Sequence, residues 1–436
     1  MRDLPAADEL WRFEARDGIE GGPTIVNGTG YVGSADSHVY ALDVQTGEER
    51  WRFETGDEVT GAPAVSEDTV VVGSTDGLLY GIDTKDGTER WSFETTSDAT
   101  AEVDTSPTVI NGTAYVGGGG IGDSYVHAVG IESGSERWRF ETDESVNGSP
   151  TVVDVASADA ESTTDRVVFV TSGTFDGIAH ALDAGDGTER WRFQPEAQVS
   201  ASPTVPVDST VNGTGTAQTP DDTGEDVPPI DPERSVYIVN GSHHGTLSTL
   251  DTVTGETHWE VDTRGNLATM PTVAGGIVYF GSQNGVLYAI DAMSGEKCWA
   301  VDASFDTGLG VTADPTVVGD TVVVGTLATI VLGVDTDEGG TRWTFSTEGR
   351  PSPATVVDGT AFFGTDEGTL YAIDVPNETG NSTGSRVLRG TLGHHDHTVH
   401  RRPYPDFTET CLNCETNLAH LEEPSYCPNC GWELSA

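Results

Sequence analysis

The sequence is poor in lysine and has no long apolar run. Lys85 and Lys297 are the only lysines among 436 residues, and 21 basic residues stand against 71 acidic ones, for a formal net charge of −50. No segment approaches the ~18 apolar residues that a transmembrane helix needs, and the N-terminus lacks the apolar core and cleavage site of an export signal. We therefore expect a cytoplasmic protein without a membrane span. So few basic residues also argue against direct binding to nucleic acid.

The excess of acidic residues predicts that the protein works at high salt. Many like charges destabilise a compact chain through mutual repulsion. At ~1 M salt the Debye length falls to about 3 Å, which removes most of that repulsion. The composition resembles that of haloarchaeal proteins, so we expect a salt-rich cytoplasm. An acidic secreted protein, with or without bound calcium, is the alternative.

Cysteine is scarce, and four of the five cysteines form one motif. They are two C-x-x-C pairs separated by twelve residues, namely Cys411, Cys414, Cys427 and Cys430. Four thiolates suit a tetrahedral Zn²⁺ site. Residues 408–434 resemble a zinc ribbon, although Glu415 stands where that family usually has a glycine. We expect one structural zinc ion per chain, whose binding supplies the folding free energy of this small unit. Two disulfides or an iron site are the alternatives.

A polar stretch precedes the cysteine motif. Residues 375–405 contain few apolar side chains, and we expect them to form a flexible linker between the repeat region (10–374) and the zinc ribbon (406–436). The linker also holds a group of histidines, namely His394, His395, His397 and His400. Imidazole nitrogens suit a transition metal, so a second metal site is the alternative interpretation of this stretch.

The rest of the chain is a repeat that ends in tryptophan. The run Ala-Leu-Asp-Val-Gln-Thr-Gly-Glu-Glu-Arg-Trp ends at Trp51 and returns in close or weaker copies that end at Trp91, Trp138, Trp191, Trp259, Trp299 and Trp343. Trp11 opens the chain with only the end of the motif. A repeat of this length is one supersecondary unit that cannot bury its apolar face alone.

Each repeat predicts four antiparallel strands. A short strand follows a proline, an Asn-Gly type of turn leads into a strand that ends in glycine, and two further strands carry Tyr-Ala-Leu-Asp and Trp-Arg-Phe-Glu. Eight groups of the first three strands occur, at 22–43, 62–83, 106–131, 149–183, 202–251, 270–291, 314–335 and 352–374. Four-stranded units at this period are propeller blades. The sequence therefore predicts an all-β, eight-bladed β-propeller followed by a zinc ribbon.

Closure of the ring needs a fourth strand for the eighth blade, and the chain offers two. The segment Leu10–Glu14 contains the full Trp-Arg-Phe-Glu sequence, so we expect it to complete that blade and cover its edge. The rival is the segment that ends at Leu388, which fits the turn motif with leucine at the tryptophan position.

These motifs resemble the tryptophan-docking repeats of the pyrroloquinoline-quinone (PQQ) propellers, which include quinoprotein dehydrogenases and BamB-type assembly scaffolds. The resemblance covers roughly residues 10–390. It implies that each tryptophan stacks between blades on a neighbouring Thr-Gly turn, so that Trp51 with Thr46 and Gly47, and Trp91 with Asp86 and Gly87, are structural. Gly130 and the run 337–339 depart from the motif, so we expect blades three and seven to be less regular.

The resemblance also implies what an enzyme of the family needs: adjacent cysteines, a calcium site and a catalytic aspartate. None of the five cysteines is adjacent to another, and Cys298, beside a repeat tryptophan, is expected to be a packed core thiol. Candidate cation ligands in the loops between second and third strands are Asp36, Asp76, Asp123, Asp176, Asp366, His243 and His244. An acidic surface suited to high salt is the simpler interpretation of these loops.

Two insertions interrupt the repeat period, at residues 154–165 and 206–234. Both fall between the first and second strands of a blade and therefore on one face of the disc. Solvated loops are the simpler interpretation of both, and partner binding is the other.

The sequence as a whole favours a non-catalytic, monomeric scaffold that binds another protein, with zinc but no PQQ as cofactor and no catalytic residues. A PQQ-dependent alcohol or sugar oxidoreductase is the alternative, and a zinc-ribbon protein acting near nucleic acid is the third hypothesis.

Overall fold

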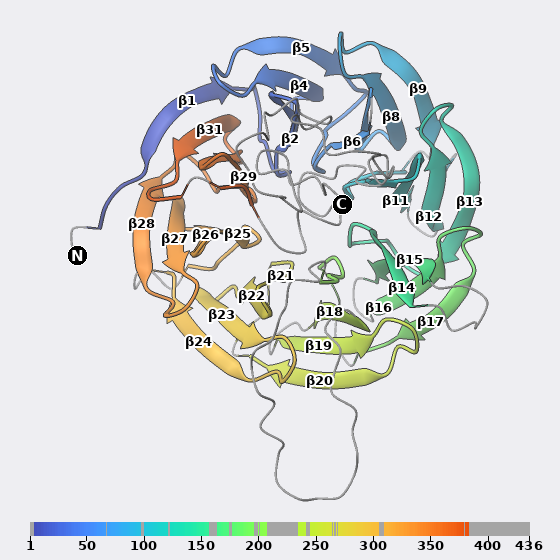
Figure 1. Cartoon of the computed structure of the whole chain (residues 1–436). Coiled ribbons are helices and arrows are strands. Elements are labelled where there is room, and N and C mark those ends of the chain that lie inside the picture. Colours follow the sequence, from blue (N-terminus) through green and yellow to red (C-terminus); the bar gives the residue numbers. More distant parts are fainter. Residues whose placement is uncertain are drawn as a thin grey trace, which may run out of the picture.

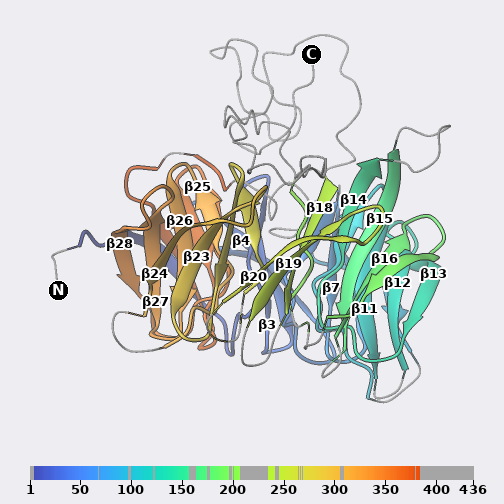
Figure 2. The same cartoon turned by 90° about the horizontal axis from the view of Figure 1, so that it is seen from below.

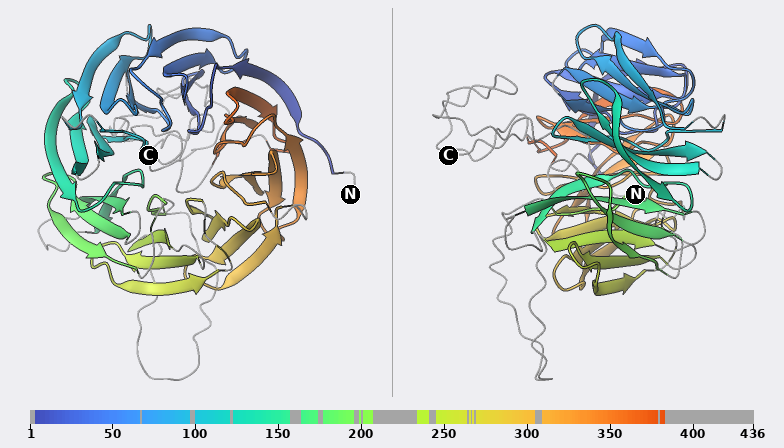
Figure 3. Two further views of the ribbon diagram at one scale, coloured as in Figure 1. Left: turned by 180° about the vertical axis from the view of Figure 1, so that it is seen from behind. Right: turned by 90° about the vertical axis from the view of Figure 1, so that its right-hand side faces the viewer.

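Eight β-sheets form a closed ring. The computed structural model describes residues 4–382 except 67, 97–99, 121–122, 157–163, 174–176, 196–198, 200, 207–233, 241–244, 264, 266, 268, 305–308 and 379. Figure 1 looks down the axis of the ring, Figure 2 shows the disc from its side, and Figure 3 adds views from behind and from the right. The predicted eight-bladed, all-β propeller is confirmed. In this part of the chain no helix is long and apolar enough to cross a membrane.

The first four blades follow one another along the chain, each with its strands in sequence order from the axis outward. Blade one comprises β2 (Thr24–Val26), β3 (Thr29–Ser34), β4 (His38–Asp43) and β5 (Glu49–Glu54). Blade two comprises β6 (Ala64–Ser66), β7 (Thr69–Gly73), β8 (Leu78–Asp83) and β9 (Glu89–Glu94). Blade three comprises β10 (Thr108–Ile110), β11 (Thr113–Gly120), β12 (Asp123–Gly130) and β13 (Ser135–Thr142). Blade four comprises β14 (Thr151–Ala156), β15 (Thr164–Ser172), β16 (Ile178–Asp183) and β17 (Glu189–Phe193).

The other four blades repeat this order, with exceptions in blades five and eight. Blade five comprises β18 (Ser235–Asn240), β19 (Thr246–Asp251) and β20 (Thr257–Asp262). Blade six comprises β21 (Thr272–Ala274), β22 (Ile277–Gly281), β23 (Val286–Asp291) and β24 (Lys297–Asp302). Blade seven comprises β25 (Thr316–Val318), β26 (Thr321–Thr326), β27 (Ile330–Asp335) and β28 (Thr341–Ser346). Blade eight comprises β29 (Thr355–Val357), β30 (Thr360–Phe363), β31 (Thr369–Asp374) and β1 (Asp8–Glu14).

Blade five has a reduced inner strand. Thr204 and Tyr237 exchange backbone hydrogen bonds of 2.9 and 2.7 Å, and this isolated bridge stands where the other blades have a first strand. Pro203 matches the proline that precedes the first strand of other blades, but Pro206, two residues after Thr204, is found only in this blade. Because proline has no N–H to donate, the ladder stops after one pair of residues.

The hydrophobic core lies between the blades. One buried cluster combines Tyr31 and Val39 of blade one with Val65 and Val70 of blade two, and the other clusters pair neighbouring blades in the same way. Outer strands alternate, so that in β5 Trp51 is buried while both flanking arginines are exposed. Each blade therefore depends on its neighbours for burial of apolar surface, as in other repeat proteins.

The disc has two faces of different construction. We call the side with the turns between first and second and between third and fourth strands, such as 26–29 and 43–49, the turn face. The opposite side has the loops between second and third strands, such as 34–38, and the linkers to the next blade, and we call it the loop face. The insertions begin after β14 and after Val205, so both are attached on the turn face, as predicted from the order of the strands.

The N-terminal strand closes the ring. β1 pairs antiparallel with β31, with Trp11 opposite Ala372, so the first and last strands of the propeller lie side by side (Figure 1). The expectation that the Trp11 strand completes blade eight is confirmed. The rival segment that ends at Leu388 lies outside the described residues.

The chain stays attached to blade eight after its last strand. Ser382 Oγ accepts a hydrogen bond of 2.6 Å from the backbone N–H of Val356, and Asn381 accepts one of 2.8 Å from the N–H of Asp358. Glu378 accepts a hydrogen bond of 2.9 Å from the Thr321 hydroxyl of blade seven. These contacts lie beside the turn between β29 and β30, so the described chain ends on the turn face.

Candidate functional site

The repeat tryptophans hold neighbouring blades together. The Trp51 indole N–H donates a hydrogen bond of 2.9 Å to the carbonyl of Thr84 in the next blade, and its ring lies on Gly87. Gly87 has φ +72°, and a Cβ there would stand 2.7 Å from the ring, so glycine is required for both conformation and contact. The structural role implied for these residues is confirmed, but Trp51 docks on the turn of the following blade and not on Gly47, which is covered by Trp11. The other repeat tryptophans except Trp343 dock in the same way.

The two turns that depart from the motif keep its geometry. The Gly134 N–H bonds to the carbonyl of Gly130 at 2.9 Å and the Gly339 N–H to that of Asp335 at 3.0 Å, close to the 2.8 Å of the matching bond in blade one. The expectation that blades three and seven are less regular is therefore wrong. In blade one Asp43 accepts hydrogen bonds from Arg50 and from the N–H groups of the turn, and blade three lacks these bonds because Gly130 has no carboxylate. Arg137 keeps the bond to the carbonyl of Gly112 that Arg50 makes to that of Gly28.

Trp343 of blade seven docks differently. Blade eight has no turn that joins β31 to an outer strand, because its fourth strand comes from the N-terminus. The Trp343 indole nitrogen has no hydrogen-bond partner in the described structure. Residues 5–7 lie there instead, pairing with Thr344 through backbone bonds of 3.1 and 3.2 Å, and Ala7 packs in the same cluster as Trp343. The N-terminal segment thus covers the one tryptophan that has no turn to cover it.

A second set of contacts joins the blades at the central axis. The first threonine of an inner strand donates its hydroxyl proton to the carbonyl that precedes the equivalent strand in the next blade. Seven such bonds of 2.5–2.8 Å are made by Thr24, Thr108, Thr151, Thr204, Thr272, Thr316 and Thr355. The bond from Thr355 to the carbonyl of Pro23 closes the circle. Blade two has Ala64 at this position and makes no such bond.

The acidic loops use their carboxylates to hold the backbone. Asp36 accepts hydrogen bonds from the Tyr40 hydroxyl (2.6 Å) and the Arg16 N–H (3.0 Å), and Asp76 accepts the same pair from Tyr80 and Gly56. Burial raises the pKa of Asp36, but these hydrogen bonds outweigh it and hold the pKa below its ordinary value. Each aspartate therefore fastens the linker from the preceding blade to the third strand of its own.

Asp366 is not equivalent to these residues, contrary to expectation. The pairing of Phe363 with Tyr371 matches that of Val72 with Tyr80, which places Glu367, and not Asp366, at the position of Asp76. Asp366 forms an ion pair with Arg350 at 2.6 Å. Of the other candidate cation ligands, the Asp123 side chain, Asp176, His243 and His244 lie outside the described residues. In the described part of the chain no three metal-ligating side chains come together.

The comparisons with known proteins agree with this architecture. The family described as outer membrane protein assembly factor BamB matches residues 3–158, 122–226 and 176–395. The chain belongs to this family. None of the curated protein sequences matches the chain.

Solved structures with the same fold include both scaffolds and enzymes. BamB from Moraxella catarrhalis is 17% identical with a TM-score of 0.64, over 85% of this chain and 100% of that one. A quinohemoprotein alcohol dehydrogenase from Pseudomonas putida HK5 is 17% identical with a TM-score of 0.63, over 84% and 76%. The designed protein Ika8 is 16% identical with a TM-score of 0.63, over 84% and 99%. At such identities the likeness shows the fold alone.

The cysteines of this BamB-family chain divide between the propeller and its tail. Cys298 is exposed on outer strand β24, so the expected packed core thiol is wrong. It directly precedes a docking tryptophan, and neighbouring residues of a strand point to opposite sides. Partial burial still raises the pKa of its thiol. The predicted zinc ligands Cys411, Cys414, Cys427 and Cys430 lie outside the described residues, as do His394, His395 and His397.

Proposed function

We propose that the protein is a non-catalytic scaffold that binds another protein through its turn face. One observation supports this face above all. Both insertions of the repeat are attached there, and the described chain ends there at Ser382, hydrogen-bonded to the inner strand of blade eight. Three segments that do not belong to the repeat thus start from one side of a rigid ring. Loops on a rigid scaffold are common binding sites.

The structure of the loop face also supports the scaffold proposal. The carboxylates of Asp36 and Asp76 are already engaged by tyrosine hydroxyls and backbone N–H groups, so their arrangement suits support of the blades more than binding of a cofactor. The family name, an assembly factor, agrees with a role in protein interaction. The alternative is an oxidoreductase dependent on PQQ, since the quinohemoprotein alcohol dehydrogenases share the fold.

Affinity capture in ~1 M KCl tests the scaffold proposal. The full chain is compared with variants that lack 207–233 or 383–436, and with a control that carries Glu58→Lys and Glu367→Lys on the loop face, where both side chains are exposed. A partner retained by the control and lost by a deletion supports the proposal. Loss of the partner only in the control would place binding on the loop face. In a separate assay, dye reduction by the protein with PQQ, Ca²⁺ and an alcohol or aldose would show that it is an enzyme.

We further propose that the tail binds one structural Zn²⁺ through Cys411, Cys414, Cys427 and Cys430. Replacing Cys427 and Cys430 with serine removes two of four thiolate ligands, which zinc ribbons need in order to fold. Elemental analysis should show the loss of one zinc ion per chain, while calorimetry should show a nearly unchanged propeller transition. Full zinc occupancy in the double variant would move the site elsewhere, with His394, His395 and His397 the next candidates. A large fall in propeller stability would mean that the tail packs on the disc.

A further inference from the structure

The blades repeat the same side-chain contacts near the outer rim, so a departure in one blade can be recognised by comparison with the others. A phenylalanine two residues after the docking tryptophan packs its ring against a residue of the third strand in the next blade. Ring centroids are 5.1–5.4 Å apart in five such pairs, Phe13–Tyr40, Phe53–Tyr80, Phe93–His127, Phe140–His180 and Phe345–Tyr371. These rings fill the space between neighbouring blades.

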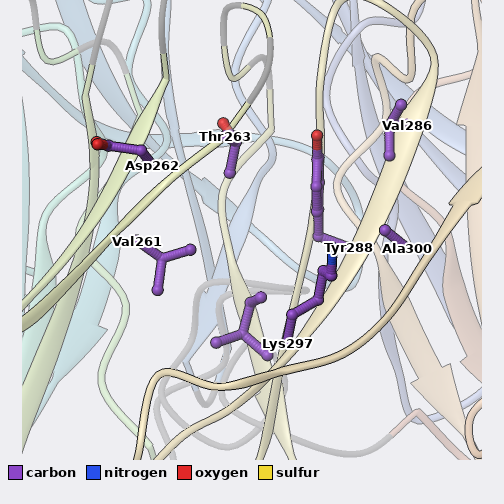
Figure 4. A pocket seen from close by; sticks show the side chains of 8 residues that line it. Val261, Asp262, Thr263, Val286, Tyr288, Lys297 and Ala300 are labelled. Carbon is purple, nitrogen blue, oxygen red and sulfur yellow. The ribbon is translucent and has the colours of Figure 1, made fainter.

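The interface between blades five and six lacks this phenylalanine. Val261 stands at its position, two residues after Trp259, and faces Tyr288 on β23. A cavity of about 380 Å³ lies there, with Val261 on one side and Val286 and Tyr288 on the other (Figure 4), and Ile290 also lines it. Its volume is in the range of small-molecule sites, which are largely apolar with a few polar groups.

Two further departures from the repeat open the rim of this cavity. Ala300 pairs with Tyr288 in the register where arginine is usual, as in Arg12, Arg52, Arg139 and Arg192. Lys297 pairs with Ile290 in the register where glutamate is usual, as in Glu9, Glu49, Glu89, Glu136 and Glu189. In blade eight Arg12 and Glu9 form an ion pair of 2.8 Å, and Arg12 covers the ring of Tyr371. Blade six therefore has no arginine opposite its tyrosine and a positive charge in place of a negative one.

The Tyr288 hydroxyl also differs from its counterparts. Tyr40 and Tyr80 each donate to an aspartate at 2.6 Å. Asn284 replaces that aspartate in blade six, and within the described structure the Tyr288 hydroxyl has no hydrogen-bond partner. Its ring is held by stacking on Phe280, with centroids 5.3 Å apart. A fixed hydroxyl is thus available at the cavity wall.

Two charged residues line the cavity, Lys297 and Asp262. Lys297 is one of only two lysines in the chain and makes no ion pair with any described residue. It lies beside Tyr288, while Asp262, on the other side, points away and accepts a hydrogen bond of 3.0 Å from Thr246 (Figure 4). A single ammonium in a strongly acidic protein suits a singly charged anion better than a doubly charged one.

We propose that this cavity is a binding site for a small aromatic carboxylate. The ligand's ring takes the place of the missing phenylalanine against Tyr288, where offset or edge contacts between rings are favourable. Its carboxylate accepts a hydrogen bond from the Lys297 ammonium, which lies at the backbone end of Tyr288, away from the hydroxyl of that residue (Figure 4). The site lies between outer strands and is separate from the turn face, so it does not depend on the scaffold function.

Titration calorimetry with phenylacetate on the full chain in ~1 M KCl tests the site. Phenylacetamide, which has the ring without the charge, and acetate, which has the charge without the ring, should both bind at least ~10-fold more weakly. Lys297→Glu restores the usual residue of the repeat and should weaken phenylacetate binding at least ~10-fold. Lys85→Glu, at the other lysine, should leave it unchanged.

The Val261→Phe variant distinguishes loss of the binding site from loss of folding. It restores the repeat's own residue, so it should fill the cavity, abolish phenylacetate binding and keep or raise the melting temperature. Absence of any phenylacetate binding by the unmodified protein would overturn the proposal. So would equal binding of phenylacetamide, an equal loss in Lys85→Glu, or undiminished binding in a folded Val261→Phe variant.

Discussion

Two buried histidines make blades three and four sensitive to acid. His127 and His180 stand where four other blades have a tyrosine, and each places Nδ1 about 3 Å from a glutamate, at 3.0 Å from Glu136 and 2.9 Å from Glu189. Burial lowers the pKa of both histidines below the ordinary value of 6.5, although the glutamates oppose this shift. Both therefore prefer the neutral form in the folded protein.

This preference predicts a loss of stability as the pH falls. Because the folded pKa is the lower one, the unfolded chain binds more protons below about pH 6.5, and protonation favours unfolding. We expect the double variant His127→Gln, His180→Gln to lose less stability than the unmodified protein between pH 7.5 and pH 5. Denaturant unfolding at each pH measures this. Parallel profiles would mean that carboxylates alone determine the acid response.

Ala64 is the residue that leaves the axial ring of hydroxyl bonds incomplete. Seven blades have a threonine whose hydroxyl bonds to the next blade, and the fully buried Ala64 has none to offer. Ala64→Thr should therefore stabilise the propeller by about 0.5–1.5 kcal/mol, the usual net value of one hydrogen bond. Ala64→Val is the matched control, because it adds the same bulk without the hydroxyl. Equal effects of the two substitutions in chemical denaturation would show that packing alone changes the stability.

At the scale of elements, the sequence predicted the blades because each strand carries a repeated signal. Tryptophan, the Thr-Gly turn and the glycine that ends the second strand recur at fixed spacing, so the eight groups and the closing strand at Trp11 could be counted. Departures were harder to predict. The single bridge at Thr204 depends on Pro206, and the displacement of Asp366 by one position depends on the register of β30 with β31.

The cavity between blades five and six could not be predicted for the same reason. Val261, Ala300 and Lys297 are ordinary residues in the linear sequence, and only the strand register brings their differences from the repeat to one place. The exposure of Cys298 likewise depends on which side of β24 it occupies. The turn on which a tryptophan docks could likewise be identified only from the structure of the ring, because the order of the motifs along the chain does not show which turn lies beside the tryptophan.

The N-terminal strand should stabilise the whole ring. Deleting residues 1–15 removes β1 from the edge of β31 and uncovers Trp343, which is only 1% exposed in the intact chain. Because buried tryptophans contribute about 3–5 kcal/mol each, we expect a loss of at least ~3 kcal/mol. Deleting residues 1–4 is the control, since it leaves Pro5–Ala7 and β1 in place. An unchanged melting temperature in the longer deletion would mean that another segment, such as the one ending at Leu388, can close the ring.

At the scale of the whole molecule, many of the arginines are already used in local pairs. Arg50 binds Asp43 at 2.7 Å, Arg90 binds Asp83 at 2.5 Å, and Arg342 binds Asp335 at 2.6 Å, each joining the fourth strand of a blade to the turn before it. Such exposed pairs contribute about 0–1 kcal/mol each. They cannot offset the repulsion in a chain with a formal net charge of −50. The charge of the molecule therefore opposes the closed ring that its local contacts favour.

The salt concentration should determine whether charge repulsion or the local contacts dominate the stability of the ring. The melting temperature should rise steeply from dilute buffer towards ~2 M KCl, since a Debye length of about 3 Å at 1 M screens carboxylates from one another. Salt also weakens the arginine pairs, but 71 acidic residues against 21 basic ones make repulsion the larger effect. A variant with Glu58→Gln, Glu132→Gln and Glu367→Gln, all at exposed sites, should be more stable in dilute buffer and should gain less from added KCl. Melting temperatures that do not change with salt would contradict this account and would point to a cationic partner as the reason for the acidic surface.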